Sequence, residues 1–196
     1  MCPFRQPKPT ESGKAEAILD AALALFAERG FHGTAVPLVA ERAGVGAGTL
    51  YRYFDSKEAL VNALYRREKQ RFGAALLTAV SPDKPTRAQF HDMWRGMARY
   101  VAEQRSSIAF MELHHHGPYI DAESRAVEDL VLTPVRAFIK DAQRRQILKP
   151  IAAEIIVALV YGAFTGLVKQ SWEGRLKLTP SVLDQAEACV WEAIRA

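Results

Sequence analysis

The chain has 196 residues, of which 49% are hydrophobic and 24% charged, and its formal net charge is +4. This length and composition are typical of a globular protein of one or two domains, and they exclude collagen-like and disordered chains. The two cysteines, Cys2 and Cys189, form no metal-ligand or disulfide-scaffold pattern, which favours a reducing cytosol. We therefore expect a cytoplasmic protein that has no metal site and no cofactor.

The sequence predicts neither a signal peptide nor a membrane-spanning helix. Its N-terminus has no apolar run of the kind found in signal peptides. The longest apolar run, residues 155–168, is shorter than the roughly 20 residues that a bilayer-spanning helix needs, and Glu154 and Lys169 close it at both ends. We expect no interaction with a membrane.

The first third of the chain predicts an arm followed by four helices. Residues 1–12 contain three prolines and predict a flexible arm. A helical apolar spacing then begins, and Gly30 is predicted to end the first helix. Thr34 is the expected N-cap of a short second helix that Gly44 ends. A third short helix is expected at 47–54, and a fourth, capped by Ser56, is expected at 57–79.

The rest of the chain predicts five further helices after a proline-containing loop at 81–86. The expected ranges are 86–104, 107–116, 122–146, 151–173, and from Thr179 to the C-terminus. No segment alternates with the period of two that strands require. We predict an all-α fold of about nine helices: an arm (1–12), a helix-turn-helix domain (13–58), a linking fourth helix (57–79) and a second helical domain (80–196).

The segment 34–57, TAVPLVAERAGVGAGTLYRYFDSK, predicts a helix-turn-helix, since a glycine-containing turn separates two short helices. In such motifs the second helix enters the DNA major groove. Gly48 permits close backbone approach, while Arg52, or Thr49 against a thymine methyl, could read bases. Tyr51, Tyr53 and Lys57 could reach phosphates. The residues that this pattern predicts to face DNA are Ala47, Gly48, Thr49, Tyr51, Arg52, Tyr53 and Lys57.

The runs ILDAALALFAERGFHGTAV and LVAERAGVGAGTLYRYFDSKEAL resemble the tetracycline-repressor (TetR) family of bacterial regulators over about residues 18–60. The resemblance implies a homodimer that binds a double-stranded DNA operator and a small organic effector. It also implies that Thr34, Tyr51, Tyr53 and Lys57 contact phosphates, and that Gly48 and Thr49 begin the recognition helix. Departures from the family pattern at Pro37, Gly46 and Ala47 shift the expected base discrimination toward Arg52, Thr49 and DNA shape.

Two apolar stripes near the C-terminus predict close helix packing, either inside one subunit or at a dimer seam. Small residues recur every four positions on the 151–173 helix, and a second stripe follows the last helix. Two such helices from each subunit would form a four-helix bundle across a two-fold axis. The residues expected to dimerise are Ala158, Gly162, Gly166, Leu183, Ala186 and Val190.

Large side chains on the middle helices are expected to form ordinary core for the most part, and a few of them to line an apolar cavity for the effector. The residues expected to line it are Trp94, Met97, Phe110, His114, Tyr161 and Phe164. Three consecutive histidines, 114–116, fan out around a helix and do not match the spacing of a metal site.

The leading hypothesis is a ligand-responsive DNA-binding regulator, most simply a repressor. A helical enzyme is the alternative, but no catalytic motif is readable from the spacing, so we expect no enzymatic activity. A protein-interaction domain that does not bind DNA is the third hypothesis, and a buried second short helix would favour it.

Overall fold

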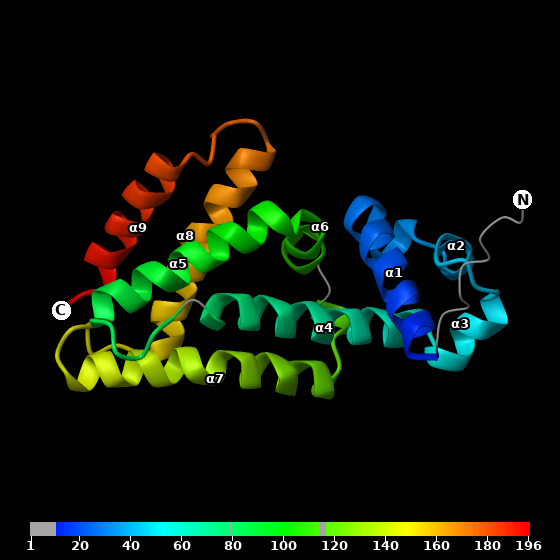
Figure 1. Cartoon of the computed structure of the whole chain (residues 1–196), viewed down its shortest axis with the longest axis horizontal. Coiled ribbons are helices and arrows are strands. Elements are labelled where there is room, and N and C mark those ends of the chain that lie inside the picture. Colours follow the sequence, from blue (N-terminus) through cyan, green and yellow to red (C-terminus); the bar gives the residue numbers. More distant parts are fainter. Residues whose placement is uncertain (1–10, 79, 114–116) are drawn as a thin grey trace, which may run out of the picture. The chain divides into compact units, whose positions relative to one another are not determined.

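The structure is a computed structural model that describes residues 11–78, 80–113 and 117–196 (Figure 1). Within these ranges it contains nine α-helices and no extended strand, which confirms the predicted all-α fold. The helices are α1 (Glu11–Gly33), α2 (Val36–Arg42), α3 (Ala47–Tyr53), α4 (Lys57–Thr78), α5 (Thr86–Glu103), α6 (Arg105–Ile108), α7 (Ala122–Arg144), α8 (Ala153–Trp172) and α9 (Pro180–Ile194). A short π-helix (Ala109–Leu113) follows α6, and a 3₁₀ turn (Gly117–Tyr119) precedes α7.

The helices form two compact units. Unit 1 comprises Met1–Glu68 and Ser106–Arg125, and unit 2 comprises Lys69–Arg105 and Ala126–Ala196. The sequence predicts a first domain at 13–58, a linking fourth helix at 57–79 and a second domain from residue 80, whereas the two compact units divide inside α4. The difference arises because the 106–125 segment packs with the N-terminal helices; for example, the ring centroid of Phe110 lies 6.1 Å from that of Phe26.

The core of unit 1 is formed by the apolar face of α1 and by buried residues of the next three helices. Ile18, Ala22 and Phe26 recur at helical spacing on α1, and all three are fully buried. Leu50 of α3 and Leu64 of α4 are also fully buried. The short helices α2 and α3 are therefore held by packing, because helices of this length are not stable alone in water.

Most of the helix ends confirm the sequence interpretation. Gly30 breaks the helical path of α1 with φ 68°, and Gly44 has φ 67° in the turn after α2. The hydroxyl of Ser56 accepts a hydrogen bond from the Ala59 N–H (3.1 Å), and the Thr179 hydroxyl accepts one from the Val182 N–H (3.3 Å).

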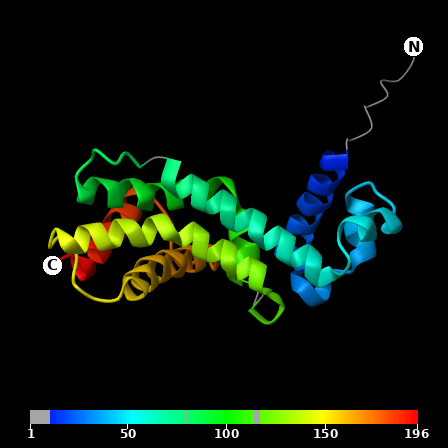
Figure 2. The ribbon, with the colours of Figure 1, turned by 90° about the horizontal axis from the view of Figure 1, so that it is seen from below.

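In unit 2 the C-terminal part of α4 lies alongside α7 (Figures 1 and 2). A Cβ atom on Gly73 would come within 2.6 Å of the Val131 side chain, so the close approach of these helices requires glycine there. The indole of Trp94 donates a hydrogen bond to the Leu183 carbonyl oxygen (3.0 Å), which ties α5 to α9. The buried carboxylate of Glu187 on α9 forms an ion pair with Arg87 on α5.

Candidate nucleic-acid interface and ligand cavity

Helices α2 and α3 and the turn between them form a helix-turn-helix. The positive φ of Gly44 reverses the chain, and the Val45 N–H donates a hydrogen bond to the Ala40 carbonyl oxygen (3.0 Å). Leu50, which is 0% exposed, anchors α3 to the core of unit 1. One side of α3 is therefore fixed inward, and the other side is presented to solvent.

The outer side of α3 carries most of the residues that the sequence indicated. Ala47, Gly48 and Arg52 are exposed, Thr49 is half-buried, and the side chain of Tyr51 is 48% exposed. A Cβ atom on Gly48 would meet nothing within 4 Å. Nothing within unit 1 therefore requires a glycine at this position, whereas a closely approaching DNA backbone would.

Tyr53 differs from Tyr51 although both were expected to contact phosphates. Tyr53 is half-buried, and its hydroxyl oxygen is buried with no hydrogen-bond partner in the part of the chain that the structure describes. The guanidinium of Arg52 lies 5.4 Å from the centroid of the Tyr53 ring. A phosphate contact by Tyr53 would require its hydroxyl to become accessible, so Tyr51 is the better placed of the two tyrosines.

Lys57 begins α4 beside this surface. Its ammonium lies 4.2 Å from the centroid of the Phe31 ring, a cation–π arrangement. Partial burial lowers the pKa of Lys57, and the neighbouring charge of Glu58 opposes this effect. A phosphate at this position would favour the charged ammonium, because an opposite charge stabilises a partly desolvated cation.

The structure corrects the interpretation of Thr34. Thr34 is not an N-cap, since Ala35 occupies that position and α2 has no side-chain cap. Its side chain is fully buried, and its hydroxyl lies 2.9 Å from the Gly30 carbonyl oxygen and 3.2 Å from that of Leu25. Because the hydroxyl donates inside the unit, it braces the break in α1 and is not available to a phosphate.

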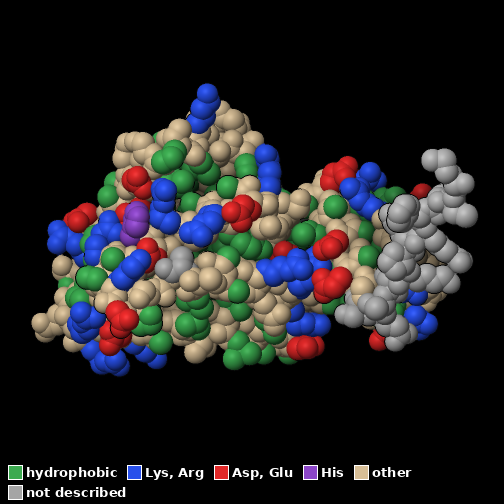
Figure 3. Space-filling view, viewed as in Figure 1, with side chains coloured by type: hydrophobic (Ala, Val, Ile, Leu, Met, Phe, Trp, Pro, Cys, Tyr) green, Lys and Arg blue, Asp and Glu red, His purple; other side chains and the backbone are tan. Residues whose placement is uncertain are grey.

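The charge on the face drawn in Figure 3 is mixed, since Lys and Arg side chains are interspersed with Asp and Glu side chains. This agrees with the modest net charge of +4.

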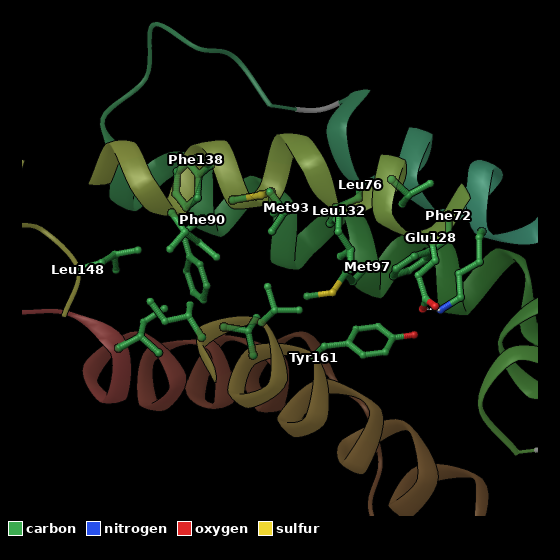
Figure 4. Close-up of a pocket in the computed structure, with 18 residues that line it drawn as sticks. Phe72, Leu76, Phe90, Met93, Met97, Glu128, Leu132, Phe138, Leu148 and Tyr161 are labelled. Carbon is green, nitrogen blue, oxygen red and sulfur yellow. Dashed lines mark ion pairs between the residues drawn. The ribbon is translucent and has the colours of Figure 1, made fainter. Parts of the chain in front are cut away.

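Unit 2 contains a cavity of about 200 Å³ with an almost entirely apolar wall (Figure 4). The residues that line it come from α4 (Lys69, Phe72, Leu76), α5 (Phe90, Met93, Met97), α7 (Glu128, Val131, Leu132, Val135, Phe138, Ile139), α8 (Ile156, Val157, Val160, Tyr161), α9 (Ile194) and the α7–α8 loop (Leu148).

Two of the expected effector residues, Met97 and Tyr161, lie in this wall. Trp94 and Phe164 do not line it; they are fully buried against each other, with ring centroids 5.3 Å apart. Phe110 packs in unit 1, and His114 lies outside the described residues. The spacing of large side chains identified buried helices but could not distinguish a cavity wall from closely packed core.

Comparison with known proteins decides the family. Residues 18–64 match the model of bacterial regulatory proteins of the tetR family, and residues 65–196 match a tetracyclin repressor-like C-terminal domain. The chain belongs to the TetR family. As a member of this family it is a DNA-binding transcriptional regulator.

Relatives of known sequence and structure agree with this TetR-family assignment. An uncharacterized HTH-type transcriptional regulator of Haemophilus influenzae is 23% identical over 92% of the chain and 95% of its own length. The HTH-type transcriptional repressor KstR2 of Rhodococcus jostii is 46% identical, but over only 29% of this chain and 28% of KstR2. The structure of a TetR-family protein from Vibrio parahaemolyticus superposes with a TM-score of 0.82 at 26% identity, covering 93% of this chain and 99% of that one.

The TetR-family C-terminal unit exposes an apolar face on α8. The expected residues Ala158, Gly162 and Gly166 are exposed, and a Cβ atom on either glycine would meet nothing within 4 Å. The same helix exposes Ile155 and Leu159, at 51% and 47%, two large residues that the four-residue repeat of small side chains does not include. On α9, Leu183, Ala186 and Val190 are half-buried.

Helix α8 is also the one helix in the described part of the chain that is long and apolar enough to cross a membrane by length and composition. Only 17% of its most apolar window is buried. A single helix of this kind in a TetR-family chain is weak support for a membrane span, and the exposed small and apolar residues equally suit contact with another helix.

No group of three or more His, Cys, Asp or Glu side chains that could hold a metal ion occurs in the residues that the structure describes. The histidines 114–116 fall outside those residues.

Proposed function

We propose that this TetR-family chain acts in the cytoplasm as a homodimeric repressor that binds a palindromic operator and responds to a small organic effector in the unit 2 cavity. The observation that carries the proposal is the exposed outer side of α3, held in place by the fully buried Leu50. To reach successive major grooves, a two-fold dimer must hold two such helices about 34–36 Å apart.

In this proposal the residues around α3 divide by role. The exposed Gly48 lets the helix approach the DNA backbone closely, and Ala47 and Thr49 lie toward the base edges. Arg52 reads bases, since arginine pairs with guanine in the major groove. Tyr51 and Lys57 hold phosphates and set the register of the helix without reading sequence.

The dimer would form through the exposed face of α8 together with α9. Ala158, Gly162 and Gly166 would allow two backbones to approach, and Ile155 and Leu159 would supply apolar area that lies in solvent in the single chain. Burial of such area is the main favourable contribution to association.

The test is a selection of genomic duplexes bound by the full chain, followed by affinity measurements on the selected site. Tyr51→Ala and Arg52→Ala are compared with Leu130→Ala, a matched control because Leu130 is exposed on α7, far along the chain from α3. We expect a palindromic site, a loss of at least about tenfold for Arg52→Ala with relaxed sequence preference, and no loss for the control.

Lys57→Gln should reduce the slope of log affinity against log salt by about 0.9 per neutralised phosphate. Failure to select any duplex, or affinities of the Tyr51 and Arg52 variants equal to that of the parent, would refute the proposal. Transcription in vitro from a promoter carrying the selected site then tests repression.

A further inference from the structure

The cavity in unit 2 is chemically different at its two ends. Leu148 and Phe138 lie at one end, where the wall is apolar. At the other end the ammonium of Lys69 forms an ion pair with the carboxylate of Glu128, with 3.0 Å between Nζ and Oε1. Figure 4 shows the Tyr161 hydroxyl pointing toward this same end.

The contact of Tyr161 with Phe72 also places Tyr161 near the charged end of the cavity. The Tyr161 ring contacts Phe72 edge to face, with centroids 5.9 Å apart. Phe72 lies three residues after Lys69 on α4 and therefore on the same side of that helix. One ion pair and one phenol thus supply the polar groups at one end of a wall that is otherwise aliphatic and aromatic.

The two members of the ion pair are not equally enclosed. The Lys69 side chain is 14% exposed, whereas that of Glu128 is 39% exposed. If an incoming ligand breaks the pair, Glu128 can turn toward water at low cost. Lys69 is already largely withdrawn from water, so an anionic ligand that takes the place of the Glu128 carboxylate keeps its charge compensated. This asymmetry favours an anionic ligand that pairs with Lys69 over a cationic ligand that pairs with Glu128.

We propose that the cavity binds a monocarboxylate with one apolar tail, whose carboxylate replaces Glu128 as the partner of Lys69. This inference rests on the proposed function in taking the cavity as the effector site, and it adds the chemical class of the effector. The volume of about 200 Å³ suits a short chain or a single ring, since an apolar cavity of roughly 150 Å³ already holds benzene. The tail lies toward Phe138 and Leu148, and the Tyr161 hydroxyl donates to the carboxylate.

The test measures binding of three eight-carbon ligands, octanoate, octanol and octylamine, to the full chain by calorimetry. Octanoate should bind at least about tenfold more tightly than the other two, as expected for one charge-assisted hydrogen bond. Lys69→Met should remove this preference by weakening octanoate alone, and Lys69→Arg should retain it. Thermal unfolding of each variant checks that the fold is intact.

Glu128→Gln separates ligand recognition from a purely structural ion pair. It removes the competing carboxylate, so octanoate should bind several-fold more tightly. Equal weakening by Lys69→Met and Glu128→Gln would show that the pair only supports the wall and would overturn the proposal. The proposal would also be overturned if octylamine bound most tightly, or if none of the three ligands bound.

The DNA measurements are kept separate from these titrations. If octanoate binds with the expected preference and the expected effects of the Lys69 and Glu128 variants but leaves operator affinity unchanged, the cavity assignment is supported and the effector role is refuted. If the chain binds an operator but does not bind octanoate, the proposed DNA function is supported and the carboxylate assignment is refuted.

Discussion

The ring of Tyr119 stacks on the ring of Phe31, with centroids 4.0 Å apart and an interplanar angle of 19°. The Tyr119 hydroxyl also lies 2.9 Å from Nε2 of His32, within hydrogen-bond distance. The ammonium of Lys57 lies over the same Phe31 ring. Tyr119, which is far from Lys57 in the sequence, therefore helps to hold in place a lysine that we propose contacts a phosphate.

Tyr119→Ala should therefore weaken both folding and DNA binding although Tyr119 lies outside the helix-turn-helix. We expect the free energy of unfolding to fall by about 1–3 kcal/mol, from loss of the stacked pair and the hydrogen bond. Denaturant unfolding and operator affinity measure the two effects. Tyr119→Phe keeps the stack and should cost less than about 1 kcal/mol; an equal loss in both variants would contradict the role of the ring.

Gly48→Ala should separate stability from DNA binding. Nothing in unit 1 occupies the space that the new methyl group would enter, and alanine favours a helix over glycine by up to about 1 kcal/mol. We expect unchanged or higher thermal stability together with operator affinity reduced by about tenfold or more, because the methyl group blocks close backbone approach. Unchanged affinity would show that Gly48 does not face DNA.

Thr34→Val should lower stability and leave the salt dependence of DNA binding unchanged. The substitution keeps the shape of the side chain but removes the hydroxyl that donates to the Gly30 and Leu25 carbonyl oxygens. The expected cost is about 1 kcal/mol of unfolding free energy, and Thr34→Ser, which retains the hydroxyl, should restore most of it. A reduced salt slope in Thr34→Val would instead indicate a phosphate contact.

Asp121 should make folding sensitive to acid. The Ser124 N–H donates to Oδ1 of Asp121 (2.7 Å) and, with the further help of Arg66, holds the pKa of Asp121 below its ordinary value of 3.8. The charged form is thus favoured in the folded state, so this stabilisation is present above pH 3.8 and is lost as the pH falls through the lower folded pKa. Asp121→Asn should flatten the decline of unfolding free energy below about pH 4; parallel curves for parent and variant would contradict this.

Leu159→Lys should produce a monomer. Leu159 is exposed on the α8 face, and a buried lysine charge would oppose association of that face. Light scattering after gel filtration should show half the parental mass, with unchanged helix content and lost affinity for a palindromic site. Leu130→Lys alters a leucine that is still more exposed, at 70%, but on α7, and it should remain dimeric. A dimer in both variants would place the interface elsewhere.

Local pattern alone was enough to predict most helix boundaries and the helix-turn-helix. The period of apolar residues, the glycines Gly30 and Gly44, and the caps Ser56 and Thr179 act within one or two turns of helix, so they can be read without knowledge of the fold. The outward position of Tyr51 and Arg52 followed from the same period, because the buried Leu50 fixes which side of α3 faces inward.

Packing between distant segments decided the remaining features. Thr34 looked like a cap but is buried, because the carbonyl groups freed at the break in α1 lie beside its hydroxyl. Tyr119 packs within the N-terminal unit, and Lys69 pairs with Glu128 at one end of the cavity, both through contacts between residues more than 50 positions apart. Periodicity shows that a helix has an apolar face, but it does not show which other helix packs against that face. The way the helices pack against one another decides whether an apolar side chain lines a cavity or lies in closely packed core.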